Sequence, residues 1–427
     1  MLTLYNFILP LLLAGLRFLS LFNPKLKRGL EGRRTLLKDV QQHYKGQKIT
    51  GPRIQIHVAS YGELEQAKPV ISEIRTRHPD AHIHLTFFSP SGYENTIGKY
   101  SDVNFISYLP IDRRKDVREF LGVVKPDIVL FARYDVWPNI ALELSRRSVP
   151  TVLFAATASE RSGRMMPFVK PLHARMYRGL TRILVISDED RARFASMGIK
   201  HDRLVVVGDT RYDQVLARKM TTEAGNRKPL PDDLTKRIEH SGTLVFMLGS
   251  SWPEDEAIIE RTLKESIERK DNILWVIVPH EPSEYHVERL LSTYRGNAIR
   301  LSAVDGDISE PIIVVDSIGK LFGLYRHANI AMIGGGFSHG LHNSLEAAVW
   351  GVPSIVGPNH RKSQEVREMI DDLAAFEVKS EREFDFVLWH MIQDVELRQS
   401  AGGRAECFVE ARQGATGRII AEIEPLL

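Results

Sequence analysis

The feature that most constrains this 427-residue chain is a repeated alternation of short apolar, β-branched runs with longer amphipathic stretches of helical period. A polar or Gly-containing turn follows each run. This alternation is typical of a parallel sheet covered by helices on both faces. The strands that we expect are residues 53–58, 82–87, 128–132, 151–155, 183–186 and 204–208, and then 243–249, 273–278, 312–315, 330–334 and 353–357.

The alternation of apolar and amphipathic segments is interrupted once, over about residues 217–240, where prolines and charged residues replace the apolar runs. We therefore predict an N-terminal segment over residues 1–50, a first domain over 51–220, a linker over 221–240 and a second domain over 241–427. Both domains should be α/β, doubly wound and Rossmann-like. Ligand is expected in a cleft where the carboxyl ends of their strands face one another, and the last helix has room to pack back on the first domain.

Composition excludes several classes of protein. The chain is 43% hydrophobic and 26% charged, which is ordinary for a globular protein. Its single cysteine, Cys407, allows no internal disulfide and fits a reducing compartment. The net charge of +3, with acidic and basic residues interspersed, gives no reason to expect a nucleic-acid partner.

The N-terminus is a local exception. Residues 1–16 carry no charge, and an apolar run, FLSLF, follows Arg17. This segment predicts a membrane anchor, and the basic residues after it place the following chain on the cytoplasmic side of an inner membrane. A cleaved signal peptide and a buried helix are the alternatives, and it stays open whether the segment spans the bilayer or lies in its interface. The basic residues are Lys25, Lys27, Arg28, Arg33 and Arg34.

Glu63 stands at the carboxyl end of the first expected strand, in the first turn of a helix. A carboxylate in this place can act as a general base. The alternative is purely structural, because residues 60–63 also match the S-x-x-E capping box, in which the glutamate bonds a backbone N–H. The spacing alone favours the cap.

A glycine-rich turn, Gly334 to Gly336, follows the strand at 330–334, and a helix is expected to begin near residues 341–343. A helix start after such a turn can bind phosphate, and Glu346 could then reach ribose hydroxyls. A first-turn glutamate that only compensates the helix dipole is the alternative. The segment matches neither a P-loop nor a dinucleotide fingerprint. We find no metal-ligand spacing among the histidines and no nucleophile elbow, so a metal site and a hydrolase are not predicted.

Taken in order, the motifs of the chain resemble the Kdo transferases of lipopolysaccharide synthesis, which move 3-deoxy-D-manno-octulosonic acid (Kdo) from CMP onto a lipid A precursor. The resemblance covers nearly the whole sequence. The motifs are HVASYGE (57–63), FFSPSGYE (87–94), DVWPN (135–139), ATASERS (156–162), GDTRYD (208–213), GSSWPEDE (249–256), VPHEP (278–282), DSIGKLFGLY (316–325), IGGGFSHGLHNSLEAAVWGVP (333–353) and VGPNH (356–360).

The resemblance implies a GT-B-type glycosyltransferase that uses CMP-Kdo as donor substrate, needs no further cofactor or metal, and acts on a lipid A precursor at the inner membrane. It makes Glu63 the catalytic base of an inverting transfer. It also implies that three segments contact the nucleotide: Pro279 and His280; Ile318, Gly319 and Lys320; and Asn343, Ser344, Leu345 and Glu346. Arg33, Arg34 and Arg133 are candidates to meet the phosphorylated acceptor, with solvated surface charge as the alternative.

The chain departs from the family pattern at several of these places. Arg133 and Asp135 stand in a segment that usually reads E-T-E-L-W-P-N, Lys320 replaces the glutamate of M-G-E, His280 replaces the arginine of P-R, and Ser344 replaces a proline. Two alternatives therefore stay open: another nucleotide-sugar transferase or epimerase of the same fold, and an inactive membrane-bound protein that binds a nucleotide sugar.

Overall fold

The computed structural model describes residues 2–158, 169–225, 230, 234–235, 238, 242–306, 308–338, 340–361 and 363–427. The described chain divides into two compact units, which we treat separately: unit 1 consists of residues 1–214 and 413–427, and unit 2 of residues 215–412. The linker expected over 221–240 lies partly outside the described residues, so the sequence-based boundaries stay predictions.

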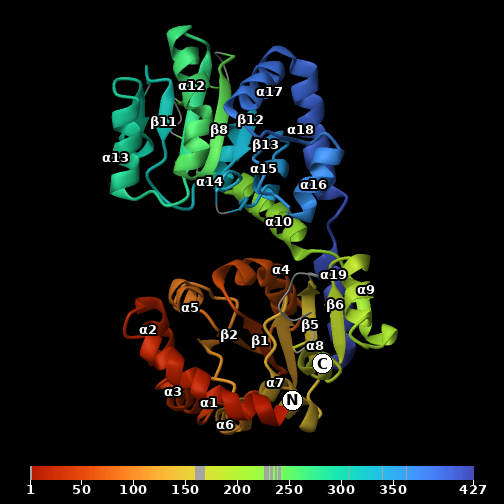
Figure 1. The fold of residues 1–427 in the computed structure, drawn as a ribbon. Coiled ribbons are helices and arrows are strands. Elements are labelled where there is room, and N and C mark those ends of the chain that lie inside the picture. Colours follow the sequence, from red (N-terminus) through yellow and green to blue (C-terminus); the bar gives the residue numbers. More distant parts are fainter. Residues whose placement is uncertain are drawn as a thin grey trace. The chain divides into compact units, whose positions relative to one another are not determined.

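Unit 1 is a seven-stranded parallel sheet in the order β3-β2-β1-β4-β5-β6-β7 (Figure 1). Its strands are β1 (Arg53–Val58), β2 (His82–Phe87), β3 (Phe105–Tyr108), β4 (Ile128–Ala132), β5 (Thr151–Ala156), β6 (Arg182–Val185) and β7 (Leu204–Val206). Its helices are α1 (Leu2–Leu19), α2 (Pro24–Glu31), α3 (Leu36–Tyr44), α4 (Tyr61–Arg77), α5 (Pro90–Thr96), α6 (Arg114–Val124), α7 (Pro138–Arg146), α8 (Lys170–Tyr177), α9 (Asp188–Ala195) and α19 (Ala415–Ile423).

Unit 2 repeats the architecture with the strand order β10-β11-β9-β8-β12-β13-β14. Its strands are β8 (Leu244–Ser251), β9 (Ile273–Pro279), β10 (Ala298–Arg300), β11 (Ile312–Val314), β12 (Ile330–Ile333), β13 (Ser354–Val356) and β14 (Ala375–Glu377). Its helices are α12 (Pro253–Glu268), α13 (Glu284–Thr293), α14 (Leu321–Leu324), α15 (Leu345–Ala348), α16 (Gln364–Asp371), α17 (Glu381–Gln393) and α18 (Val395–Glu410). Helix α10 (Thr210–Ala224) begins in unit 1 and continues in unit 2.

Each sheet separates two hydrophobic clusters, one under each helical layer. The central strands are buried on both faces, which is why they read as unbroken apolar runs. The predicted fold class, two doubly wound Rossmann-like sheets with an apolar helix at the N-terminus, is therefore confirmed. Residues Ile419, Ile420 and Ile423 of α19 belong to the cluster under α4, so the last helix lies in unit 1.

Strand order reverses at β1 and β4 in unit 1, and at β8 and β12 in unit 2. Ligands of doubly wound folds bind at such switch points, outside the carboxyl ends of the strands. Backbone strain marks both places, because Arg133 after β4 and Ser250 at the end of β8 have φ values of 59° and 56°. Functional side chains are therefore expected at these two edges.

Candidate active site

Glu63 lies in the first turn of α4, directly after β1, and is 5% exposed. Its backbone N–H donates to Ser60 Oγ at 3.4 Å, and its Oε2 accepts from the backbone N–H of Ala59 at 2.6 Å. The capping interactions of the structural alternative are thus present, shifted by one residue, and they engage one carboxylate oxygen. Among the described residues no hydrogen bond occupies Oε1, so the cap leaves Glu63 one oxygen for chemistry.

Burial raises the pKa of Glu63 above its usual value, and the negative charge of Asp135 adds to the rise. The Ala59 N–H, His57 and Arg133 act in the opposite direction. A buried carboxylate with increased proton affinity at a strand end is suited to remove a proton from a hydroxyl group. The role as base stays a prediction.

The site contains two residues that the sequence did not connect with Glu63. His57, fully buried at the end of β1, places Nε2 at 3.0 Å from Asp135 Oδ2 and Nδ1 at 3.0 Å from Thr86 Oγ1. Asp135 follows β4, so adjacent parallel strands bring together residues that are 78 positions apart. Arg133, at which the sequence departs from the Kdo transferase pattern, also belongs to these surroundings. Its positive charge acts on the carboxylate of Glu63.

The three basic residues considered for the acceptor have different surroundings. Arg33 donates to the carbonyl oxygens of Gly29, Phe88 and Leu109, and its guanidinium also lies over the rings of Phe88 and Tyr108. Burial lowers its pKa to about 10. Arg33 therefore attaches the N-terminal segment to the sheet.

Arg34 is exposed and, among the described residues, makes no side-chain hydrogen bond or ion pair. It lines a cavity of about 600 Å³ formed by α1, α2 and the segment before α6, and Arg17 and Lys27 line it too. Basic residues outnumber the acidic Glu31 and Asp116 in the lining of this cavity, which lies beside the apolar helix.

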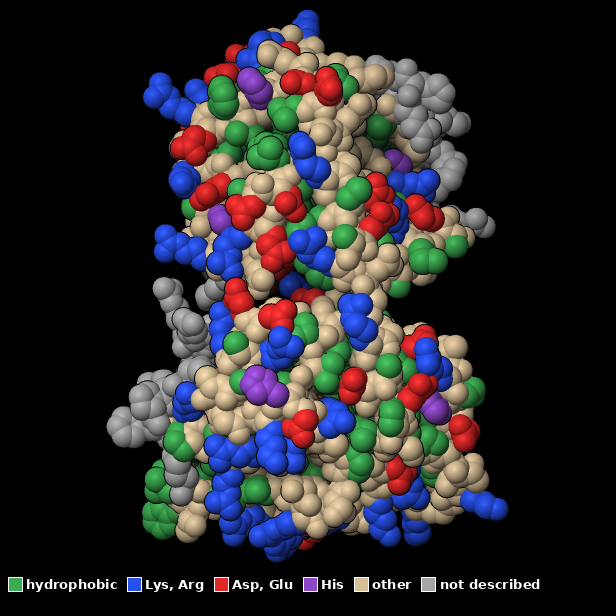
Figure 2. All heavy atoms as spheres, turned by 90° about the vertical axis from the view of Figure 1, so that its right-hand side faces the viewer, with side chains coloured by type: hydrophobic (Ala, Val, Ile, Leu, Met, Phe, Trp, Pro, Cys, Tyr) green, Lys and Arg blue, Asp and Glu red, His purple; other side chains and the backbone are tan. Residues whose placement is uncertain are grey.

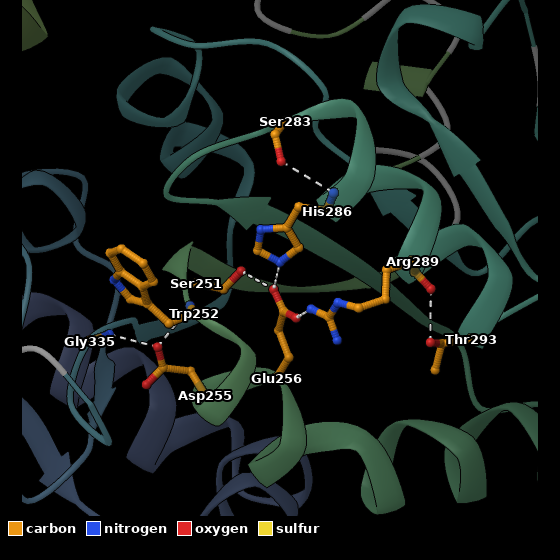
Figure 3. A network of polar contacts seen from close by, with 9 residues as sticks. All are labelled: Ser251, Trp252, Asp255, Glu256, Ser283, His286, Arg289, Thr293 and Gly335. Carbon is orange, nitrogen blue, oxygen red and sulfur yellow. Dashed lines mark hydrogen bonds and ion pairs between the residues drawn. The ribbon is translucent and has the colours of Figure 1, made fainter. Parts of the chain in front are cut away.

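In unit 2 the glycine-rich turn after β12 is held by Asp255, which is fully buried at the start of α12 (Figure 3). Its carboxylate accepts from the backbone N–H groups of Trp252 at 3.0 Å, Gly335 at 2.7 Å and Phe337 at 3.3 Å. Burial raises the pKa of Asp255, and these three donors oppose the rise. One carboxylate thus joins the turns after β8 and β12, on the two sides of the switch point.

The glycines of this turn serve the packing of the protein itself. A Cβ on Gly334 would lie 2.1 Å from Ser250 O, and one on Gly335 would lie 2.3 Å from Gly340 O. Gly336 meets Gly357 N at 2.6 Å in the same way. The sequence suggested that the glycines make room for a ligand. It did not predict that they allow segments of the protein's own backbone to approach one another.

The helix after the turn is shorter and starts later than expected. It is α15, only four residues long, and not a helix that begins near 341–343. The backbone N–H of Leu345 donates to Asn343 Oδ1 at 3.3 Å. Ser344 and Leu345 are buried as whole residues, with exposures of 1% and 0%. Asn343 is exposed.

Glu346 already has a partner. Its Oε1 lies 2.7 Å from Nη1 of Arg218 on α10, and the same guanidinium lies 4.1 Å from the centroid of the Phe322 ring. This ion pair orients the carboxylate that we expect to bind ribose. Sequence spacing could not identify Arg218, because 128 residues separate the two side chains.

The other predicted nucleotide contacts lie at the same edge or on exposed loops. Pro279 ends β9 and is buried, and His280 after it is exposed. Ile318 is 85% exposed, Gly319 has a φ of 86° with open space around its Cα, and Lys320 precedes α14. Among the described residues, 318–320 make no side-chain hydrogen bond to the other two segments.

A group of three rings surrounds His280. The indole of Trp252 and the imidazole of His342 are inclined by only 11° and share a hydrogen bond of 3.0 Å from Nε1 to Nε2. The ring of His280 lies over His342, with 4.2 Å between centroids, and 5.0 Å from Trp252. Because Nε2 of His342 accepts this bond, its proton must be on Nδ1. The rings bring the ends of β8 and β9 and the turn after β12 together.

A second buried carboxylate supports this edge. Glu256 accepts from Ser251 Oγ at 2.7 Å and pairs with His286 Nε2 at 2.8 Å and with Arg289 on α13 (Figure 3). Among the described residues no group of three or more His, Cys, Asp or Glu side chains is arranged to hold a metal ion. The expectation that no metal or cofactor is needed stays a prediction.

The two doubly wound parallel sheets define a GT-B-like α/β fold. A solved UDP-GlcNAc 2-epimerase of Neisseria meningitidis, bound to UDP-GlcNAc, has the same fold with a TM-score of 0.61. It is 13% identical and the match covers 87% of this chain and all of that one, a likeness that concerns the fold alone.

Sequence comparison adds a more specific resemblance. A family model described as 3-deoxy-D-manno-octulosonic-acid transferase (kdotransferase) matches residues 30–214. The 3-deoxy-D-manno-octulosonic acid transferase of Haemophilus influenzae is 25% identical over 98% of this chain and 96% of its own length, and that of Aquifex aeolicus is 25% identical over 83% and 91%. The chain is thus similar to Kdo transferases over nearly its whole length, and these relatives support a glycosyltransferase.

Proposed function

We propose that this protein transfers Kdo from CMP-Kdo to a lipid A precursor in lipopolysaccharide synthesis, with inversion at the anomeric carbon. The observation that carries the proposal is the buried carboxylate of Glu63, at the switch point of unit 1, in a chain that aligns with Kdo transferases over nearly its full length. Glu63 removes the proton of an acceptor hydroxyl, the hydroxyl oxygen bonds to the anomeric carbon, and CMP leaves with the electron pair of the broken bond.

For the donor substrate, the proposal depends on residues of unit 2. Asp255 fixes the glycine-rich turn at the switch point, and Glu346, oriented by Arg218, suits a ribose hydroxyl. His280 replaces the family arginine beside this edge. The reaction in this form needs no metal or further cofactor.

For the acceptor, the proposal depends on unit 1 and on contact with the membrane. Helix α1 is long and apolar enough to cross a bilayer. Its polar residues, however, bind unit 1: Tyr5 donates to Asp112 Oδ2 at 2.9 Å, and Asn6 accepts from Asn139 at 2.8 Å. The opposite apolar face is exposed, with Phe7 at 74% and Leu11 at 66%. This supports a helix that lies in the interface of the inner membrane, with the catalytic units on the cytoplasmic side.

Charge supports the same orientation. Unit 1 has 34 Lys and Arg residues against 23 Asp and Glu, although the whole chain is nearly neutral. Figure 2 shows Lys and Arg side chains gathered on the unit that is red to yellow in Figure 1, whereas the two signs are mixed on the other. Basic residues beside an apolar helix favour an anionic lipid surface and a phosphorylated lipid substrate. We expect no nucleic-acid partner.

The test is incubation of the purified protein in detergent with CMP-Kdo and a lipid A precursor, with the lipid products resolved by mass. One or more mass increments of Kdo are expected, and no increment would overturn the proposal. A separate measurement tests the donor: millimolar CMP should raise the melting temperature, and UDP at the same concentration should not. Stabilisation by UDP alone would favour the alternative of another nucleotide-sugar enzyme of this fold.

A further inference from the structure

The surroundings of Glu63 contain a second carboxylate, Asp135. The side chain is 18% exposed, so it reaches the surface next to a base that is almost fully buried. Its charge is one of the charges that act on Glu63. Oδ2 of Asp135 is engaged by His57, and among the described residues Oδ1 has no hydrogen-bond partner. Asp135 therefore has one fixed oxygen and one that is open to a ligand.

The imidazole of His57 fixes the orientation of the Asp135 carboxylate. A carboxylate oxygen only accepts hydrogen bonds, so the contact of 3.0 Å requires a proton on Nε2 of His57. On the other side of the ring, Nδ1 lies 3.0 Å from the hydroxyl of Thr86, which also lies 3.2 Å from Ile56 O. The imidazole is fully buried and bonded at both ends, so it holds Asp135 in one orientation.

The two carboxylates have complementary properties. Glu63 is buried, bonded to one backbone N–H, and has its pKa raised by that burial, whereas Asp135 is bonded to a histidine N–H and partly open. Two acids whose surroundings differ in this way take different tasks. A sugar acceptor offers several hydroxyl groups, and an ionised carboxylate binds them as a hydrogen-bond acceptor.

We propose that Asp135 is an acceptor-binding residue of the Glu63 site and that His57 is the positioning residue that orients it. The open oxygen of Asp135 receives one sugar hydroxyl of the acceptor, while Glu63 takes the proton of the neighbouring hydroxyl that attacks the donor. The inference rests on the proposed function. It gives the segment from Arg133 to Asp135, where the chain departs from its family, a task in binding the acceptor.

The experiment compares D135N with D127N in the transferase assay. Asp127 is the matched control, because it lies at the opposite, amino end of β4, where its Oδ2 accepts from Arg53 N. We expect D135N to raise the KM for the lipid acceptor about tenfold or more, to leave the KM for the donor unchanged, and to move the acid limb of the kcat/KM profile to lower pH. The shift follows because the negative charge that raises the pKa of Glu63 is lost.

Variants of His57 test the positioning role. H57A should reproduce the rise in acceptor KM, and H57Q, which keeps an N–H donor, should restore part of it. In the double variant H57A/D135N the effects should not add, because both changes remove one interaction. Melting temperatures identify a variant that fails to fold. D135N remains informative in that case because it keeps the shape of the side chain, and H57Q because it keeps an N–H donor.

The outcomes are distinguishable from a failure of the proposed function. Absence of transfer by the unaltered protein would overturn the proposed function itself. Transfer by the unaltered protein together with an unchanged acceptor KM and an unchanged pH profile in D135N would overturn only the role of Asp135. Effects of H57A and D135N that add fully would overturn the positioning role of His57.

Discussion

The carboxylate of Glu63 accepts a hydrogen bond of 2.6 Å from the backbone N–H of Ala59, in the turn that joins β1 to α4. The cap and the base are compatible roles for this residue, because the bond engages one oxygen and leaves the other. Glu63 can therefore be held in place as a cap and still remove a proton. The cap fixes the position of the base.

A substitution at Glu63 can therefore remove the catalytic base and leave the cap in place. In E63Q the amide oxygen can still accept from Ala59, so the free energy of unfolding should change by less than about 1 kcal/mol. The amide cannot take a proton, so kcat should fall about 10²-fold to 10⁴-fold. Steady-state rates and urea denaturation of the same preparation measure both. E65Q, two residues further on the helix, is the control and should keep its rate. A fully active E63Q would end the assignment of the base.

The ion pair between Arg218 and Glu346 gives a second prediction. If Glu346 binds the ribose, E346Q should raise the KM for CMP-Kdo about tenfold with little change in kcat, because a bond to a charged acceptor is weakened in ground and transition state alike. The pair is partly exposed, so stability should change by no more than about 1 kcal/mol.

Donor saturation curves measure this effect. The matched control is E406Q, which removes a carboxylate that pairs with Lys219 on the same helix α10. An unchanged donor KM in E346Q would leave Glu346 as a structural partner of Arg218 only.

A cluster of histidines predicts loss of stability in acid. Burial lowers the pKa of His82 to about 4 and that of His84 well below its usual value, and His43 lies 3.0 Å from His82. The unfolded chain takes up these protons near pH 6.5, and the folded protein does so only at lower pH. Stability should therefore fall as the pH decreases from about 6.5 to about 4, with a contribution of His82 on the order of 3 kcal/mol.

Urea denaturation at pH 7.5, 5.5 and 4.5 checks this dependence. H82Q should flatten it, because the substituted side chain binds no proton in the unfolded state. The exposed His201 provides the control, and H201Q should retain the slope of the unaltered protein. Equal slopes for H82Q and the unaltered protein would show that the acid sensitivity lies elsewhere.

The attachment of α1 to unit 1 is also testable. Tyr5 donates to Asp112, whose carboxyl also accepts the backbone N–H groups of Asn139 and Ile140 and whose pKa burial raises to about 6. Y5F removes one bond of about 1 kcal/mol, so the amides of α1 should exchange hydrogen several times faster in detergent. In S20A the lost hydroxyl bonds only to Arg17 O, and exchange should stay the same. Unaltered exchange in Y5F would mean that α1 is held by other contacts.

The sequence predicted the central strands with errors of one or two residues, because strands buried on both faces are continuous apolar runs. It missed β3, β10 and β14. All three are edge strands of three or four residues with partly exposed side chains, so no apolar run marks them. The expected cleft between the domains stays a prediction.

For the site, the sequence by itself determined what is local: a glutamate after the first strand, a glycine-rich turn after a later one, and the motifs that resemble those of Kdo transferases. Only the tertiary structure decided which side chains meet there. His57 meets Asp135, Asp255 meets Gly335, and Arg218 meets Glu346 across 78, 80 and 128 residues. The physical reason is that periodicity and capping act within a few residues, whereas these contacts depend on strand order, which is fixed when the sheets assemble.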